Sequence, residues 1–197
     1  MKSLLTTIFF LLFAATGSVL AQTNNYMLTD DSKMMIEGTS TIHDWECDVQ
    51  EINLDITMDT TALSGDTTSS PVKSLSLSVP VEKIESGKGG MNKKIYGALK
   101  KDKHPNIMFN LTNTELTNVT DSNMQLNVTG MLNIAGVEKE VSFPVEGTMQ
   151  EDGSYKFTGE YELNMKDYEV DPPSAVFGTI KSGEMVTITF DFIVAKA

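Results

Sequence analysis

The sequence contains no arginine, a single cysteine and only two histidines, and each shortage excludes a class of site. Lys supplies every basic side chain, so the chain lacks the planar, bidentate fork that dedicated phosphate and carboxylate clamps use. Cys47 has no second cysteine to pair with, so stability must come from a buried core rather than a disulfide. His43 and His104 lie far apart, whereas a zinc site needs several N, S or O ligands together. We therefore expect no metal and no cofactor.

The chain also lacks an excess of positive charge and a second long apolar run. Its net charge is −12, and an acidic surface repels phosphate backbones, so nucleic acid is not an expected partner. After residue 21 no apolar segment is long enough to span a bilayer, and we expect no stable membrane anchor. The sequence leaves a homodimer open.

The first 21 residues have the layout of a cleavable secretory signal. Lys2 forms a minimal positive region, the uncharged run Leu4–Ala15 follows, and Val19-Leu20-Ala21 supplies a cleavage site. An uncleaved anchor is the alternative, but the run is shorter than the ~20 apolar residues of a spanning helix. We therefore predict a signal peptide over 1–21, one domain over 22–197, and export to the periplasm or the medium.

Alternation of apolar and polar residues dominates the rest of the chain, which is the signature of half-buried strands. Ala135-Gly136 and Glu151-Asp152-Gly153 are predicted tight turns, and Thr60–Ser70 is predicted as a loop rich in Thr, Ser, Gly and Asp. The alternating segments number about eight. They are Met34–Thr39, His43–Met58, Leu75–Val81, Ile107–Leu111, Met124–Ile134, Val137–Val145, Tyr155–Met165 and Val186–Val194.

The second of these segments changes the parity of its apolar positions. They are odd-numbered up to Val49 and even-numbered from Ile52 onward. A one-residue shift sends every side chain to the other face of a sheet, so this change predicts a β-bulge or sharp bend near Gln50-Glu51. Antiparallel strands in this number can close into a barrel that holds one small ligand, although alternation equally allows a two-sheet sandwich.

One segment departs from the β pattern. Met91, Ile95 and Leu99 recur at four-residue spacing, which predicts a helix over Met91–Lys101. The surrounding residues 83–103 are locally positive on an acidic protein. The helix is therefore either an ordinary solvated surface element or a lid that attracts an anionic head group.

No set of residues forms a recognisable catalytic centre. Nucleophilic catalysis needs a nucleophile, a base and an orienting group, and the sequence lacks a Gly-x-Ser-x-Gly elbow. His43 and Cys47 are the best local candidates, because they share one face of an extended strand with Trp45. The simpler interpretation is that Trp45 and Cys47 pack inward beside a hydrogen-bonded His43. The carboxylates of Asp167–Pro173 are more simply explained as a solvated loop than as a weak cation site.

Four groups of segments, in this order, resemble the YceI-like family of lipid- and polyisoprenoid-binding proteins. Together they run across nearly all of the chain after the predicted signal. They are Gly38–Glu46 with its His43-Asp44-Trp45; Met91–Leu99 followed by His104–Phe109; Val128–Val141; and Leu163–Tyr168 with Asp171–Pro173 and Gly178–Phe190.

The resemblance implies an all-β fold, an eight-stranded antiparallel, lipocalin-like extended barrel with one short helix beside it. It also implies a periplasmic or secreted location and an apolar tunnel for a polyisoprenoid, quinone-like or fatty-acyl chain. We expect the helix to line one end of this tunnel, and Lys93 and Lys94 to contact the head group. The expected tunnel and mouth residues are His43, Trp45, Met91, Ile95, Tyr96, Leu99, Ile107, Phe109, Phe143, Phe157, Tyr161, Phe190 and Phe192.

Three functions follow as hypotheses. The favoured one is an exported carrier without enzymatic activity, since burying about twenty carbons would gain on the order of 10 kcal/mol before ordering costs. The second is a small-molecule or metal-dependent enzyme that uses His43 and Cys47. The third is an interaction module whose interior is packed by its own aromatic side chains.

Overall fold

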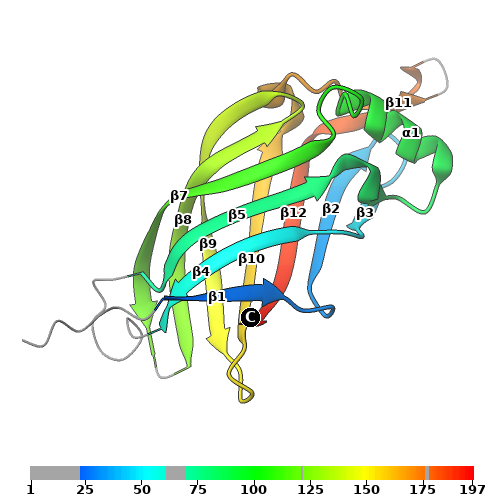
Figure 1. Ribbon diagram of the computed structural model, residues 1–197. Coiled ribbons are helices and arrows are strands. Elements are labelled where there is room, and N and C mark those ends of the chain that lie inside the picture. Colours follow the sequence, from blue (N-terminus) through cyan, green and yellow to red (C-terminus); the bar gives the residue numbers. More distant parts are fainter. Residues whose placement is uncertain (1–22, 61–69, 121, 176–177) are drawn as a thin grey trace, which may run out of the picture.

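The computed structural model describes residues 23–60, 70–120, 122–175 and 178–197, which form strands and, within these ranges, one α-helix (Figure 1). The strands are β1 (Thr23–Leu28), β2 (Lys33–Ser40), β3 (Trp45–Val49), β4 (Asn53–Asp59), β5 (Val72–Pro80), β6 (Ile84–Glu85), β7 (Asn106–Val119), β8 (Asn123–Ile134), β9 (Val137–Met149), β10 (Tyr155–Asn164), β11 (Ser174–Ala175) and β12 (Ile180–Lys196). The helical elements are α1 (Gly89–Ala98) and the short 3-10 turns η2 (Val81–Lys83) and η3 (Met165–Tyr168).

The sheet closes on itself. Its order β1-β4-β5-β7-β8-β9-β10-β12 returns to the start because β12 pairs with β1, with Lys196 opposite Tyr26. The same edge of β12 pairs further along with β2, where Ile188 lies opposite Ile36. β2, β3 and β6 therefore continue the wall toward α1 (Figure 1). The prediction of a closed, eight-stranded antiparallel barrel with one helix is confirmed.

The predicted bend lies between β3 and β4. β3 ends at Val49 and β4 begins at Asn53, so the two strands are separated by a short break. Across this break the apolar parity changes, yet Val49, Leu54 and Ile56 line the same interior cavity. The extra residues therefore keep both halves of the segment facing the core, as the parity change predicted.

The turn at Ala135-Gly136 joins β8 to β9, whose residues Ile134 and Val137 face each other. Both turn residues have positive φ, 52° at Ala135 and 88° at Gly136. This is the conformation of a two-residue hairpin whose twist matches that of the flanking strands. Glycine at the second position removes the steric cost there, and the predicted tight turn is confirmed.

One strand and several boundaries differ from the sequence prediction. β7 runs on to Val119, and β12 begins at Ile180. β1 was not expected, because its sequence shows no alternation of apolar and polar residues, and only Tyr26 is buried in it. The helix begins at Gly89 and ends at Ala98, before the predicted Lys101. Lys100 adopts a left-handed φ of 55°, and the Lys101 amide donates back to the Tyr96 carbonyl at 2.9 Å, which closes the helix. The predicted loop at Thr60–Ser70 falls mostly outside the described residues.

Candidate functional site: an apolar cavity in the barrel

The barrel encloses a cavity of about 140 Å³. A cavity needs only roughly 10–15 Å³ to admit one water, so this space is large. Its wall is built from inward-facing side chains of the barrel strands, and of these only Thr114 and Tyr161 carry a hydroxyl, amide or charged group among the described residues. An apolar space of this kind holds water poorly and suits a hydrocarbon chain.

The exposed fractions of the inward-facing side chains divide the barrel interior into two zones. Leu54, Leu75 and Ile188 face the cavity, yet each is only half-buried, which shows that free space remains beside them. At the end away from α1 the interior is filled, and Met58 is 0 % exposed. There the rings of Tyr26 and Tyr155 meet edge to face with their centroids 5.8 Å apart. The cavity is therefore open in the middle of the barrel and plugged at one end.

Aromatic rings lie over glycines on neighbouring strands. A Cβ at Gly130 would lie 2.4 Å from Cζ of Phe109, and one at Gly159 would lie 2.4 Å from Cζ of Phe190. Because no real Cβ could occupy either position, glycine is required for the rings to approach the wall so closely. The rings therefore lie against the wall and leave the centre of the barrel free.

Several of the predicted site residues meet in this cavity. Phe143 is the centre of the group, with ring centroids 5.7 Å from Phe109, 5.3 Å from Tyr161 and 6.2 Å from Phe190. Contact of these residues with a ligand stays a prediction. The predicted residues in the wall are Ile107, Phe109, Phe143, Phe157, Tyr161, Phe190 and Phe192.

The helix residues do not line this main cavity, contrary to the sequence prediction. Ile95 and Leu99 instead line a second apolar cavity of about 80 Å³, together with Trp45. Ile36 and Ile107 line both cavities, so the smaller one adjoins the larger. The inward stripe of α1 thus covers an annex between the helix and the wall, because the helix packs on the outer end of the strands (Figure 1).

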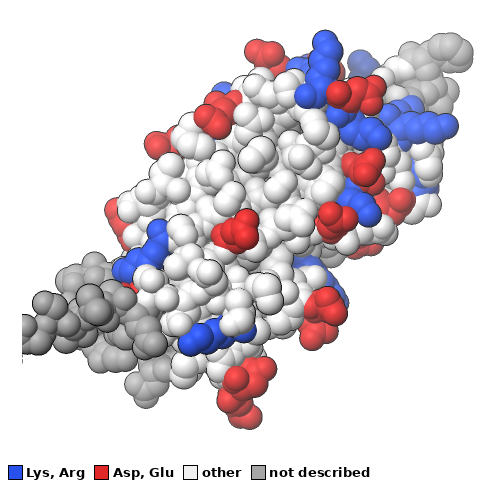
Figure 2. Space-filling model, viewed as in Figure 1, with Lys and Arg blue, Asp and Glu red and all other residues white. Residues whose placement is uncertain are grey.

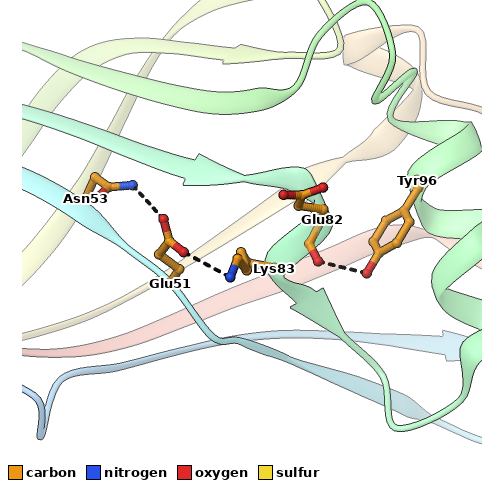
Figure 3. A network of polar contacts seen from close by, with 5 residues as sticks. All are labelled: Glu51, Asn53, Glu82, Lys83 and Tyr96. Atoms are coloured by element: carbon orange, nitrogen blue, oxygen red, sulfur yellow. Dashed lines mark hydrogen bonds and ion pairs between the residues drawn. The ribbon is translucent and has the colours of Figure 1, made fainter.

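Polar contacts fix α1 to the wall (Figure 3). The Tyr96 hydroxyl, predicted to lie at the tunnel mouth, donates to the Glu82 carbonyl at 3.0 Å. The adjacent Lys83 pairs with Glu51 across 3.1 Å, and Asn53 donates to the same carboxylate. The hydrogen bond from Lys83 lowers the pKa of Glu51 below its ordinary value. Tyr96 therefore attaches the helix to the connection between β5 and β6.

Two further contacts involve the polar residues of α1. Asn92 is 7 % exposed and donates to Glu85 at 2.6 Å. Lys94 donates from Nζ to the Ser174 carbonyl of β11, while Lys93 is exposed. Figure 2 shows that most of the lysines on that face gather at the α1 end, next to several carboxylates. Neither Lys93 nor Lys94 lines the apolar cavities, and their contact with a head group stays a prediction.

His43 and Met91 line an open groove on the outer face of the wall instead of the tunnel. Carboxylates share this groove, including those of Glu37, Glu160 and Glu162. The outward side chains of β10 alternate with inward ones such as Tyr161, which explains why the groove is polar. His43 and Met91 line neither of the two apolar cavities, and their contact with a ligand at the tunnel or its mouth stays a prediction.

His43 and Cys47 are not joined by a hydrogen bond in the described part of the chain. His43 is exposed, with Nδ1 2.7 Å from the Asp44 carbonyl oxygen, and Cys47 is 1 % exposed. The Trp45 indole donates to the Thr39 carbonyl at 2.9 Å and packs against the core. Among the residues that the structure places, no group of three or more His, Cys, Asp or Glu is arranged to hold a metal ion. The geometry therefore agrees with the simpler interpretation of this segment.

The sequence model of the YceI-like domain matches residues 27–194. The chain belongs to the YceI-like family. No curated protein sequence matches it.

Solved structures share the fold of this YceI-like protein at low sequence identity. Burkholderia cenocepacia BcnA is 17 % identical with a TM-score of 0.66, covering 83 % of this chain and 96 % of its own. A polyisoprenoid binding domain from Saccharophagus degradans is 11 % identical with a TM-score of 0.64, covering 87 % and 98 %. The Campylobacter jejuni YCEI protein is 15 % identical with a TM-score of 0.61, covering 80 % and 87 %.

Sequence reasoning missed part of the wall of this YceI-like barrel. Leu54, Leu75 and Ile188 line the cavity and have the same parity as their buried neighbours, so the alternation could have identified them. Tyr168 and Val170 are 2 % and 3 % exposed, although they fall in the segment interpreted as a solvated loop. The local sequence pattern did not predict their burial, because that burial depends on how η3 folds back on the barrel.

No helix within the described ranges combines the length and apolar content of a membrane span.

The thiol of Cys47 should make the stability of the YceI-like protein depend on pH. Burial, with the nearby carboxylates of Asp48, Glu85 and Glu46, raises the pKa of Cys47 from 9.0 to about 11. The folded state therefore favours the protonated thiol, and this contribution is complete below pH 9 and is lost as the pH rises through about 11. We expect the stability advantage of the wild type over Cys47→Ala to shrink across this interval.

Urea unfolding of both proteins at several pH values measures this difference directly. The comparison cancels the titration of Lys and Tyr residues that the two proteins share. An advantage that stays constant from pH 8 to pH 11 would contradict the assigned protonation of Cys47.

Proposed function

We propose that this YceI-like protein holds a long apolar amphiphile inside its barrel and so carries or sequesters it. The supporting observation is the cavity of about 140 Å³ with an almost wholly apolar wall. Of its two polar side chains, Thr114 already donates to the Val72 carbonyl at 3.2 Å. Each buried CH₂ contributes about 0.8 kcal/mol, so a long chain gains affinity from length alone.

A polyisoprenoid, a quinone-like lipid or a fatty-acyl chain has the required chemistry. The structurally similar domain from Saccharophagus degradans binds polyisoprenoids, and the proposal extends that ligand class to this chain. The free space in the barrel disfavours an interior packed by its own aromatic residues. The buried thiol of Cys47, with its raised pKa, disfavours an enzyme that uses it as a nucleophile.

The proposal includes export. Residues 1–21 would be removed as a signal peptide, and the domain over 22–197 would work in the periplasm or outside the cell. YceI-like proteins are typically periplasmic, and the family match begins at residue 27. Mass determination of the protein from a periplasmic or culture fraction should give a chain that starts at Gln22. A chain that keeps Met1 would contradict export by cleavage.

Native mass spectrometry of protein purified from its own host tests the carrier function. We expect an additional mass that corresponds to one lipid and that is released on unfolding. The stripped protein should take up one molecule of an added isoprenoid alcohol such as phytanol. Protein that carries no lipid from its host and ignores added phytanol would overturn the proposal.

A further inference from the structure

The inward-facing rows of the barrel strands continue past the main cavity into the annex beneath α1. On β12, Ile188 lines the main cavity and Val186 lines the annex. On β3, Val49 and Cys47 divide in the same way. Residues two apart on a strand point to the same face, so each pair belongs to one row of inward side chains. The annex is therefore a continuation of the barrel interior rather than a separate pocket on its outside.

Two isoleucines, Ile36 and Ile107, form a neck between the two spaces, because each of them lines both. Ile36 lies opposite Ile188 on β12 and opposite Cys47 on β3, where the lining of one space gives way to that of the other. Both neck residues are only half-buried, so free space remains beside them as it does in the main cavity. A hydrocarbon chain in the main cavity therefore meets apolar groups on the way to the annex.

The annex is the direction in which a long chain can extend. At the opposite end of the barrel Met58 is 0 % exposed, and the rings of Tyr26 and Tyr155 fill the interior. The annex adds about 80 Å³ to a main cavity of about 140 Å³, which is more than half as much again. A chain too large for the main cavity therefore gains apolar contacts by entering the annex.

The chemistry of the annex suits hydrocarbon and not a head group. Its wall holds aliphatic and aromatic side chains together with Met165 and Cys47. The Trp45 indole already donates to the Thr39 carbonyl at 2.9 Å, and the thiol of Cys47 is a weak donor. An alcohol or phosphate placed there would lose its hydrogen bonds to water without replacement, which is unfavourable.

We propose that the annex is a second compartment of the lipid site, in which a hydrocarbon segment of the ligand lies under α1 after crossing the neck. Ala98 sets its capacity, because this small, half-buried side chain lines the annex and not the main cavity. The inference rests on the proposed carrier function and deepens it. It makes the choice between short and long chains depend on α1, so that long chains are favoured by more than the main cavity alone could provide.

Ala98→Val and Ala98→Leu test the annex, because they fill it in two steps without reaching the main cavity. The probes are phytanol and hexane, which is small enough to lie in the main cavity alone. Equilibrium partition of labelled probe from cyclodextrin into the delipidated protein measures both affinities. The two substitutions should weaken phytanol binding about fourfold and about fifteenfold, as lost contact with about one and two CH₂ groups would give. The affinity for hexane should change less than about twofold.

The matched control is Gly97→Leu. Gly97 is exposed on the same helix, and no atom lies within 4 Å of the position of its Cβ, so the added side chain points into open space. This variant should bind both probes like the wild type. Without ligand, Ala98→Leu should raise the Tm by about 2–4 °C, because it fills an empty space. If leucine is too large and lowers the Tm, the fourfold loss for Ala98→Val decides the question.

The outcomes separate the annex from the carrier function. Equal phytanol affinities for the wild type, both Ala98 variants and Gly97→Leu would show that the chain stays out of the annex, which refutes the inference and leaves carriage intact. Equal losses for phytanol and hexane would refute it as well, because the substitutions would then act on the main cavity. A wild type that binds neither probe refutes carriage itself.

Discussion

Replacing Leu75 with Trp should lower the affinity for phytanol about a hundredfold while the protein stays folded. Leu75 faces the free part of the cavity and is only half-buried, so the larger ring enters space that the ligand would otherwise occupy. Loss of contact for about three to four CH₂ groups, at roughly 0.8 kcal/mol each, corresponds to that factor. Partition of phytanol from cyclodextrin measures the affinity, and circular dichroism confirms the fold.

Ser74→Trp is the matched control, because Ser74 lies on the same strand and is exposed on the outer face. The substitution adds the same ring to β5, but the ring does not enter the cavity. The affinity of the Ser74→Trp protein for phytanol should therefore equal that of the wild type. Equal affinities for Leu75→Trp and Ser74→Trp would mean that the lipid does not occupy the barrel interior.

Gly130→Ala should destabilise the fold by about 3 kcal/mol, near the upper end of the overpacking range. The new Cβ would lie 2.4 Å from Cζ of Phe109 and 2.5 Å from the carbonyl oxygen of Asn110. The Phe109 ring can move only into the cavity, and the Asn110 oxygen belongs to the paired strand β7 and cannot move alone. Tm should fall by roughly 6–12 °C, and phytanol binding should weaken as Phe109 is displaced.

Gly97→Ala provides the comparison within the same chain. Gly97 lies in α1, and no atom lies within 4 Å of the position of its Cβ. Alanine there should raise stability by about 0.5–1 kcal/mol, because it restricts the unfolded chain and favours the helix. Thermal unfolding of both variants measures the two changes in stability. A Gly130→Ala protein as stable as Gly97→Ala would show that the close ring-to-wall packing is absent in solution.

The sequence predicted the barrel wall well because alternation reports directly on which side of a strand is buried. The parity change before Ile52 located the break between β3 and β4, and the aromatic set from Phe109 to Phe192 proved to face one cavity. The closure of the barrel was harder to predict from the sequence. It depends on the pairing of β12 with β1, and β1 shows a single buried residue, Tyr26, so its sequence gave no signal.

The residues near the helix were the least predictable, because their positions depend on packing between distant segments. Of the apolar stripe of α1, Ile95 and Leu99 line an annex with Trp45 rather than the end of the main cavity. Met91 and His43 were expected at the mouth and lie on an outer acidic groove. Tyr168, conversely, follows a strand in a polar segment, and only the fold of η3 buries it.

Anomalous diffraction from crystals loaded with a bromine-tipped hexadecanol tests most directly whether the barrel interior holds an apolar chain. The account predicts one bromine peak inside the cavity bounded by Leu75, Phe143 and Phe190. A peak on the outer wall or at the lysines of α1, or no ordered bromine in crystals of protein that binds the probe in solution, would contradict it.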